Sequence, residues 1–376
     1  MRNITAGILC GCLLLCSRFA QAERPLLTET FLSQTFEEEL GSWVSIAPTA
    51  KVSLTHDKAH IKEGKGALQF DYGVRKGEMN ALYFPLEKAP LAKATALKFW
   101  LKSDTISIFA VVLEEKGGGH YMAAFTVPKE QWQKVELAPE DFALNNNEND
   151  PKDPNGKLDM EQIERIGVID VAQIFVQGDE NLLQLFNIKE GARVFHLDSL
   201  MATDEALPKS SVRMGDVLTL DTYVRPQMSW VSVGGLTLNR IEGKPLEGMG
   251  VEAKYHQTQG KIGALLKTFP VGTLKDAKQV ALTVASQNAI KLVVQVEEKS
   301  GGKYSTTIEI KGGSERTDFV LNLADFKVAQ DSKDSNDHLD ADQIYQIVLI
   351  DLTGATESVD RDNTLWLNRL RAIFGK

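Results

Sequence analysis

Ala96-Leu97-Lys98-Phe99-Trp100-Leu101-Lys102 alternates apolar and polar side chains, a period of two that is typical of a half-buried β-strand. The apolar members take one face of this strand, so Trp100 lies on the other face with Lys98 and Lys102. Two further apolar runs, at 106–113 and 121–127, flank a Gly117-Gly118-Gly119 turn and predict a β-hairpin. Short strands at this spacing indicate an all-β fold, either a sandwich or a barrel.

The same plan recurs later in the chain. Ser42-Trp43-Val44-Ser45 returns as Ser229-Trp230-Val231-Ser232, and Ile169-Asp170 returns as Ile350-Asp351. The offsets of the matching motifs stay between 181 and 187 residues and their order is kept, which favours a tandem duplication over chance. The pattern predicts two tandem antiparallel β-sandwich domains, at 31–204 and 217–376, joined by a polar linker at 205–216. Short helical turns are expected only at 160–164 and 341–346.

Residues 1–22 have the form of a signal peptide. A positive Arg2 precedes a short apolar run at 4–16, and Ala20-Gln21-Ala22 has the small residues of a cleavage site. The run is shorter than the ~20 residues that cross a bilayer, and no other stretch approaches that length. The sequence therefore predicts an exported protein, periplasmic or extracellular, without a transmembrane segment. Lipidation at Cys12 is the less favoured alternative.

The positions of the cysteines and the net charge exclude several kinds of site and partner. All three cysteines lie in the predicted signal peptide, which excludes a disulfide framework and a thiolate zinc site from the remainder. Loss of Arg2 and Arg18 leaves 40 of the 42 basic side chains against 51 acidic ones. A net charge of about −11 repels phosphate backbones, so nucleic acid is not an expected partner.

The order of these segments resembles a known superfamily. An opening Phe36-Glu37-Glu38, the strand around Trp100, and a closing Phe195-His196-Leu197-Asp198 resemble the galactose-binding-like jelly roll. The pattern is most similar to family-eleven-type carbohydrate-binding modules and to the complex I intermediate-associated domain. It covers residues 31–204 well and 217–376 more weakly. The resemblance implies a two-sheet jelly roll, a glycan held in a concave cleft in some members, and in many a structural calcium ion.

A sugar site needs flat aromatic faces with hydrogen-bonding side chains around them. Trp100 between Lys98 and Lys102 is the first candidate, and Tyr83 and Tyr121 are expected to add to the same surface. Packing of these aromatic side chains in the core or under a loop remains the alternative. At the positions matching the Trp100 trio, the second repeat has Thr283 and two alanines, so a sugar site is expected in the first repeat only.

The resemblance also implies a calcium site in the first domain, formed by Glu37 and Asp198. An ordinary pair of surface carboxylates is the alternative. Asp153 to Asp159 resembles part of an EF-hand loop, but the first ligand and the final glutamate of that motif are missing. A solvated turn-rich loop is therefore the favoured interpretation.

No His-Glu-x-x-His, Gly-x-Ser-x-Gly or P-loop motif is present. The leading hypothesis is an exported, non-catalytic protein whose first domain binds a polysaccharide or oligosaccharide. The alternatives are a structural or protein-interaction module of the cell envelope, such as an assembly factor, and a jelly-roll lyase or hydrolase.

Overall fold

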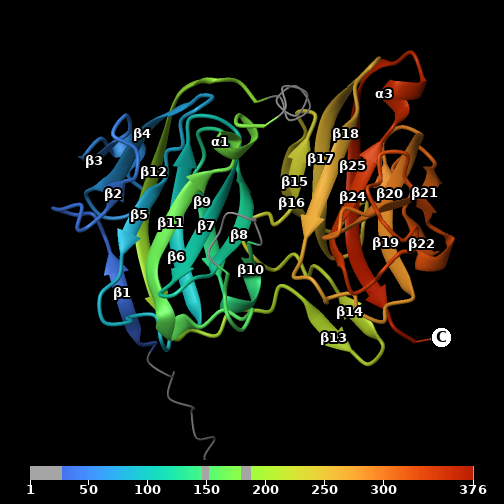
Figure 1. Ribbon diagram of the computed structural model, residues 1–376. Coiled ribbons are helices and arrows are strands. Elements are labelled where there is room, and N and C mark those ends of the chain that lie inside the picture. The colour runs from blue at the N-terminus through green and yellow to red at the C-terminus, as the bar shows by residue number, and fades with distance from the viewer. Residues whose placement is uncertain (1–27, 146–151, 179–187, 376) are drawn as a thin grey trace, which may run out of the picture.

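The computed structural model describes residues 28–145, 152–178 and 188–375. Two antiparallel β-sandwiches follow one another along the chain and lie side by side (Figure 1). The predicted signal peptide at 1–22 falls outside the described residues. Among those described, no helix is long and apolar enough to cross a membrane.

The first sandwich consists of two six-stranded sheets. Sheet A runs in the order β3 (Lys51–Thr55), β4 (Ala67–Val74), β12 (Gly191–Thr203), β6 (Ala96–Ser103) and β9 (Gln133–Leu137), with β1 (Thr30–Gln34) paired to β12. Sheet B runs in the order β10 (Ala143–Leu144), β8 (His120–Val127), β7 (Ser107–Glu115), β11 (Ile163–Asp170), β5 (Leu82–Pro85) and β2 (Val44–Ser45).

The second sandwich repeats this strand order. Sheet C contains β13 (Val212–Met214), β14 (Val217–Thr219), β25 (Asp360–Ile373), β17 (Met249–Thr258) and β16 (Thr237–Glu242), and β25 also pairs with β19 (Gln279–Ser286), which pairs with β22 (Thr317–Asn322). Sheet D contains β15 (Val231–Val233), β18 (Gly263–Thr268), β24 (Ile344–Asp351), β20 (Ile290–Glu298), β21 (Lys303–Ile310) and β23 (Lys327–Val328).

Each sandwich buries its own core between its two sheets. Phe70, Phe99, Phe125 and Phe195 fill the first core, as the alternation around Trp100 predicts. The repeated tryptophans, Trp43 and Trp230, lie in equivalent places in the two cores. A β-bulge also recurs. One extra residue in β12 interrupts its pairing with β6 near Ser199, and one extra residue in β25 interrupts its pairing with β19 near Arg369.

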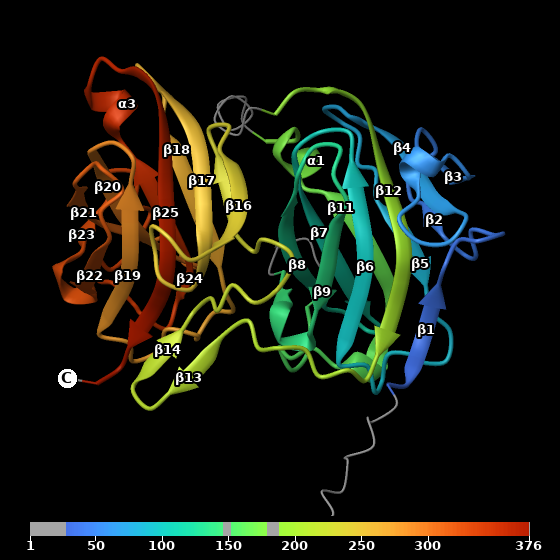
Figure 2. The ribbon, with the colours of Figure 1, turned by 180° about the vertical axis from the view of Figure 1, so that it is seen from behind.

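Two expectations about local structure are wrong. The stretch predicted as linker, 205–216, contains β13, which pairs with β14 to form a hairpin on the edge of sheet C (Figure 2). The turn predicted at 341–346 is not helical, because β24 already begins at Ile344. Its counterpart is a single 3-10 turn, η3 (Met160–Gln162).

The short helices η1 (Lys58–His60), η2 (Pro139–Asp141), η4 (Leu323–Asp325), α1 (Ala172–Phe175) and α3 (Thr353–Thr356) complete the described fold.

Candidate functional site

Trp100 projects from the outer face of sheet A, as its strand pattern predicts, but its ring is not an open platform. The ammonium of Lys62 lies 4.4 Å from the ring centroid. The indole Nε1–H donates to Glu63 Oε1 at 2.8 Å. Both residues belong to the loop that follows η1, so this loop covers the tryptophan and satisfies its donor.

The two lysines beside Trp100 are likewise engaged. Lys98 forms an ion pair with Glu205. Lys102 donates to the carbonyl of Ala59 at 3.0 Å and lies 3.5 Å from a carboxylate oxygen of Glu130. The predicted trio therefore exists as a neighbourhood on sheet A, but its polar groups bind the protein's own loops.

Glu37 and Asp198 hold the same loop by its amides. Asp198 is fully buried, and its Oδ2 accepts the N–H groups of Lys62 at 2.8 Å and Glu63 at 2.9 Å. Glu37 Oε2 accepts the N–H of Lys65 at 2.8 Å. A Cβ at Gly64, where φ is +68°, would lie 1.5 Å from Glu37 Oε1, so a side chain there would strain the backbone and displace the Glu37 carboxylate.

The two carboxylates predicted to bind calcium therefore hold the loop through one oxygen each. Calcium takes six to eight oxygen ligands, whereas each of these two carboxylates already accepts loop amides. No group of three or more metal-ligating side chains occurs in residues 28–145, 152–178 and 188–375. Burial raises the pKa of Asp198, and its hydrogen bonds from Glu63 and Lys62 oppose that shift.

Tyr121 does not share a surface with Trp100, which corrects the sequence prediction. It lies on β8 of the opposite sheet, with its ring in the core and 3% of its surface exposed. Its hydroxyl donates to Asp153 in the loop that resembles an EF-hand. Alternate residues of β8 point to the same face of the sheet, so Tyr121 points into the core with Ala123 and Phe125.

The Asp153 loop is held together by its own side chains, as the solvated-loop interpretation predicts. Asp153 Oδ1 accepts the Asn155 N–H at 3.1 Å, and Asn155 Nδ2 donates to Asp159 Oδ2 at 2.8 Å. The second sandwich repeats these contacts: Asp334 accepts the Asn336 N–H at 3.3 Å, and Asn336 donates to Asp340 at 2.9 Å. The oxygens in both loops are used locally.

Tyr83 lies on the outer face of sheet B, so it too is separated from Trp100. It stands opposite Gly167 in the β5–β11 register, and a Cβ at Gly167 would lie 2.8 Å from Tyr83 Cε1. The missing side chain of Gly167 therefore lets the half-buried tyrosine ring lie against β11. The Arg165 guanidinium carbon is 5.8 Å from the ring centroid.

An apolar strip surrounds this ring. Ala110, Val112 and Ile169 are buried on the outer face of sheet B, and Tyr83, Met122 and Val171 pack over them. Arg165 Nε lies 2.6 Å from Glu114 Oε2 at the rim of the strip. We call the surface formed by Tyr83, Gly167, Met122, Val171 and the Arg165–Glu114 pair the Tyr83 surface. Gly167 has no sequence signal of its own, since only the pairing register shows what lies over it.

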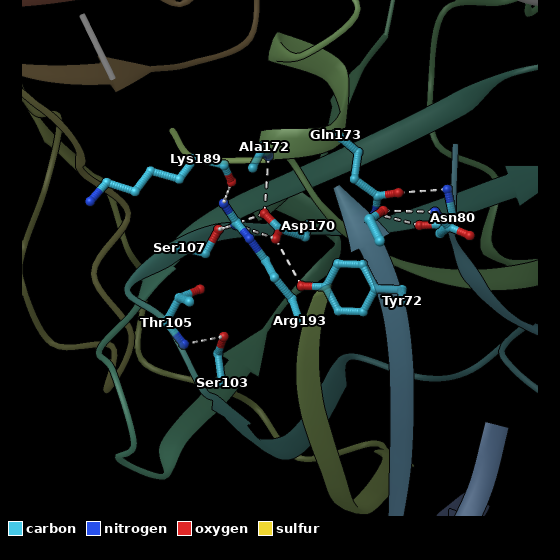
Figure 3. Close-up of polar contacts among 11 residues, drawn as sticks. Tyr72, Asn80, Ser103, Thr105, Ser107, Asp170, Ala172, Gln173, Lys189 and Arg193 are labelled. Atoms are coloured by element: carbon cyan, nitrogen blue, oxygen red, sulfur yellow. Dashed lines mark hydrogen bonds and ion pairs between the residues drawn. The ribbon is translucent and has the colours of Figure 1, made fainter. Parts of the chain in front are cut away.

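A second polar cluster lies at one end of sheet B (Figure 3). Asp170 is fully buried and accepts four hydrogen bonds, from Tyr72 at 2.8 Å, Ser107 at 2.5 Å, the Ala172 N–H at 3.0 Å and Arg193 at 2.7 Å. Arg193 also donates to the carbonyl of Lys189. Because Asp170 is saturated by internal donors, we assign this cluster to the fold. The repeated Ile-Asp pair was its only sequence signal.

No protein-family model matches this sequence, and no curated protein matches it. Solved structures that it matches include a family 11 carbohydrate-binding module from Clostridium thermocellum in complex with a β-1,3-1,4-mixed-linked tetrasaccharide. That match has 15% identity and a TM-score of 0.32, and it covers 45% of this chain and 97% of the module. A CBM22-1–CBM22-2 tandem domain of Paenibacillus barcinonensis Xyn10C matches at 12% identity and a TM-score of 0.28, over 92% of this chain and 98% of the tandem. At these values neither match decides the ligand.

Proposed function

We propose that this chain is an exported, non-catalytic carbohydrate-binding protein that holds a polysaccharide or oligosaccharide on the Tyr83 surface. The observation that carries the proposal is the tyrosine ring lying against Gly167 within an apolar strip. A pyranose has apolar C–H faces and a polar rim, so it stacks on an aromatic ring and needs hydrogen bonds at its edge. Arg165 and Glu114 supply a donor and an acceptor at that edge.

The second sandwich supports this choice by contrast. Leu266 and Val348 face one another at the register position that Tyr83 and Gly167 occupy in the first sandwich. The face of sheet D around them is aliphatic, formed by Val233, Ala264 and Ile350. We therefore assign the glycan to the first sandwich and a supporting role to the second.

The wider assignment is part of the same proposal. Residues 1–22 direct export to the periplasm or the medium, and 31–204 and 217–376 are the two copies of a duplicated domain. The shared strand order of the two sandwiches supports duplication. The saturated hydrogen bonding of the buried Asp170 supports a non-catalytic role for this cluster.

Affinity gel electrophoresis and a glycan array, run on residues 23–376, test the proposal. A soluble polysaccharide that retards the wild type is expected to bind the Tyr83→Ala variant at least tenfold more weakly, because a stacked ring contributes about 1.5–3 kcal/mol. Gly167→Ala should also weaken binding, since its methyl group displaces the ring. Leu266→Ala is the matched control and should bind like the wild type.

The outcomes separate the candidate surfaces. Binding lost in Trp100→Ala and kept in Tyr83→Ala would move the site to sheet A and overturn this assignment. Absence of binding to every glycan by folded protein would favour the alternative of an envelope scaffold. The predicted calcium ion is tested in the same preparation, where a rise in Tm on adding Ca²⁺ that EDTA reverses would support it.

A further inference from the structure

A cavity of about 210 Å³ lies where the two sandwiches meet. Met122, Ala124 and Asp141 line it from the first sandwich, and Tyr223, Arg225 and Lys267 line it from the second. One water needs only ~10–15 Å³ of such space, so the cavity is large enough for a small molecule or for one group of a larger ligand. It adjoins sheet B at Met122 but contains neither Tyr83 nor Gly167.

Arg225 is the unusual residue of this cavity. Its side chain is 6% exposed, and Nε, Nη1 and Nη2 all lack a hydrogen-bond partner among the residues that the structure describes. Its single ion-pair contact is Asp141 Oδ2 at 3.2 Å. That carboxylate already accepts the Ala138 N–H at 2.8 Å and, at its other oxygen, the Ser210 hydroxyl at 2.6 Å. Burying a guanidinium whose N–H groups have no hydrogen-bond acceptor destabilises the folded protein unless a ligand binds to those groups.

Lys267, Asp221 and Arg240, which line the cavity beside Arg225, have partners. Lys267 lies 3.2 Å from Asp221 Oδ2 and donates to Ser229. Asp221 also accepts the indole N–H of Trp230 at 3.0 Å. Arg240 is engaged with backbone carbonyls, including that of Arg225 at 2.9 Å. These groups therefore leave little capacity for a ligand.

Glu140 also lines the cavity, but it is exposed to solvent. The unused capacity among the buried side chains consists of donors. Besides Arg225, the buried hydroxyl of Tyr223 has no hydrogen-bond partner in the described part of the chain. Guanidinium nitrogens can only donate, in a planar fork that matches the oxygens of an oxyanion. A ligand that complements this cavity must present acceptor oxygens to the fork.

We propose that this cavity binds an oxyanion group through Arg225, with Tyr223 as a second donor. The chemistry fits a carboxylate, as in a uronic acid, or a sulfate ester. The site shares Met122 with the Tyr83 surface but uses none of its polar groups, so failure of either proposal leaves the other standing.

Isothermal titration calorimetry and thermal melts of residues 23–376 test this site, with sodium glucuronate, sodium sulfate and neutral glucose as probes. We expect glucuronate or sulfate to bind and to raise the Tm, and glucose to do neither. The response to the two anions separates the carboxylate from the sulfate source. Arg225→Met should weaken the binding anion at least tenfold, in line with the loss of a charged hydrogen bond. Tyr223→Phe should weaken it less.

The matched control is Arg316→Gln, which removes a half-buried arginine that pairs with Glu247 in the second sandwich and does not line the cavity, and which should bind like the wild type. If Arg225→Met fails to fold, Asp141→Asn decides, because removing the competing carboxylate should tighten anion binding. Heat from neither anion, or unchanged affinity in Arg225→Met or Asp141→Asn, would overturn the proposal.

Discussion

The imidazole of His196 lies on the outer face of sheet A and stacks on the ring of His60, with 4.2 Å between centroids. Burial lowers the pKa of His196 to about 4, and the nearby charges of His60 and Lys102 act in the same direction, while Asp57 opposes them. The ring is therefore neutral in the folded protein at pH 7. An unfolded histidine titrates near 6.5, so protons bind the unfolded chain first.

This pKa predicts acid sensitivity. The free energy of unfolding is not reduced by His196 above pH 6.5, where the ring is neutral in both states. It falls as the pH drops from 6.5 towards 4, because the unfolded chain then binds a proton that the folded protein does not. After allowance for the partly solvated ring, the loss is on the order of 2 kcal/mol. Urea unfolding at pH 7 and pH 4.5 should show this difference in the wild type and a smaller one in His196→Gln. Equal differences in both proteins would assign the acid sensitivity to other groups.

At the scale of single residues, the sequence predicts which face of a strand a side chain takes, but not which other segments contact that side chain. A period of two correctly places Trp100 outside and Phe99 inside. It cannot show that the loop carrying Lys62 folds over Trp100, because that contact joins residues 38 positions apart. It also cannot show that Tyr83 lies over Gly167, because the two strands pair across 84 positions.

At the scale of elements, the repeated strand order of the two sandwiches supplies a matched pair of buried carboxylates. Asp170 on β11 pairs with the buried Arg193 of β12 at 2.7 Å. Asp351, its equivalent on β24, accepts Tyr255 at 2.7 Å and Gln257 at 2.6 Å. Within the described ranges Asp351 forms no ion pair with a cation. The buried carboxylate thus has a charged partner in the first sandwich and neutral partners in the second.

The pair predicts unequal effects of one substitution. Asp170→Asn leaves the Arg193 guanidinium buried without its counter-ion, which should cost about 3–5 kcal/mol. Asp351→Asn exchanges one acceptor among neutral donors and should cost about 1–2 kcal/mol. Denaturant unfolding of both variants measures the difference. A loss for Asp351→Asn that equals or exceeds the loss for Asp170→Asn would contradict this account.

The elements themselves were largely predictable, with an informative exception. The predicted strands at 96–102, 121–127 and 304–310 become β6, β8 and β21, because alternation reports which face each strand buries. The hairpin of β13 and β14 was missed in the polar stretch before the second sandwich. Its strands have three residues each, too few for a period to be visible. The hairpin joins sheet C because β14 pairs with β25.

At the scale of the whole molecule, the chain entering the second sandwich closes an open side of the first. Thr126 on β8, an edge region of sheet B, donates its N–H to the carbonyl of Met228 at 3.1 Å and its hydroxyl to that of Trp230 at 2.9 Å. On the edge of sheet A, Gln227 accepts the N–H of Glu136 at 3.0 Å and donates to its carbonyl at 2.7 Å.

The Gln227 amide therefore replaces a neighbouring strand at β9. Edge strands expose unpaired backbone groups that invite aggregation, and this contact satisfies one residue of such an edge. The buried position of Gln227, 6% exposed, means that water does not readily take its place. The repeated motifs in the sequence gave no sign of this junction, because each motif reports on one sandwich and not on the contact between the two.

Gln227→Ala should loosen the junction without altering either core. Two backbone groups of the half-buried Glu136 lose their partner, which should lower the free energy of unfolding of the first sandwich by about 1–3 kcal/mol. Hydrogen exchange at the Glu136 amide should accelerate, since it reports the lost bond directly. The matched control is Gln259→Ala, an exposed glutamine of the second sandwich. If both variants exchange and melt like the wild type, the two hydrogen bonds between Gln227 and Glu136 contribute nothing measurable to stability.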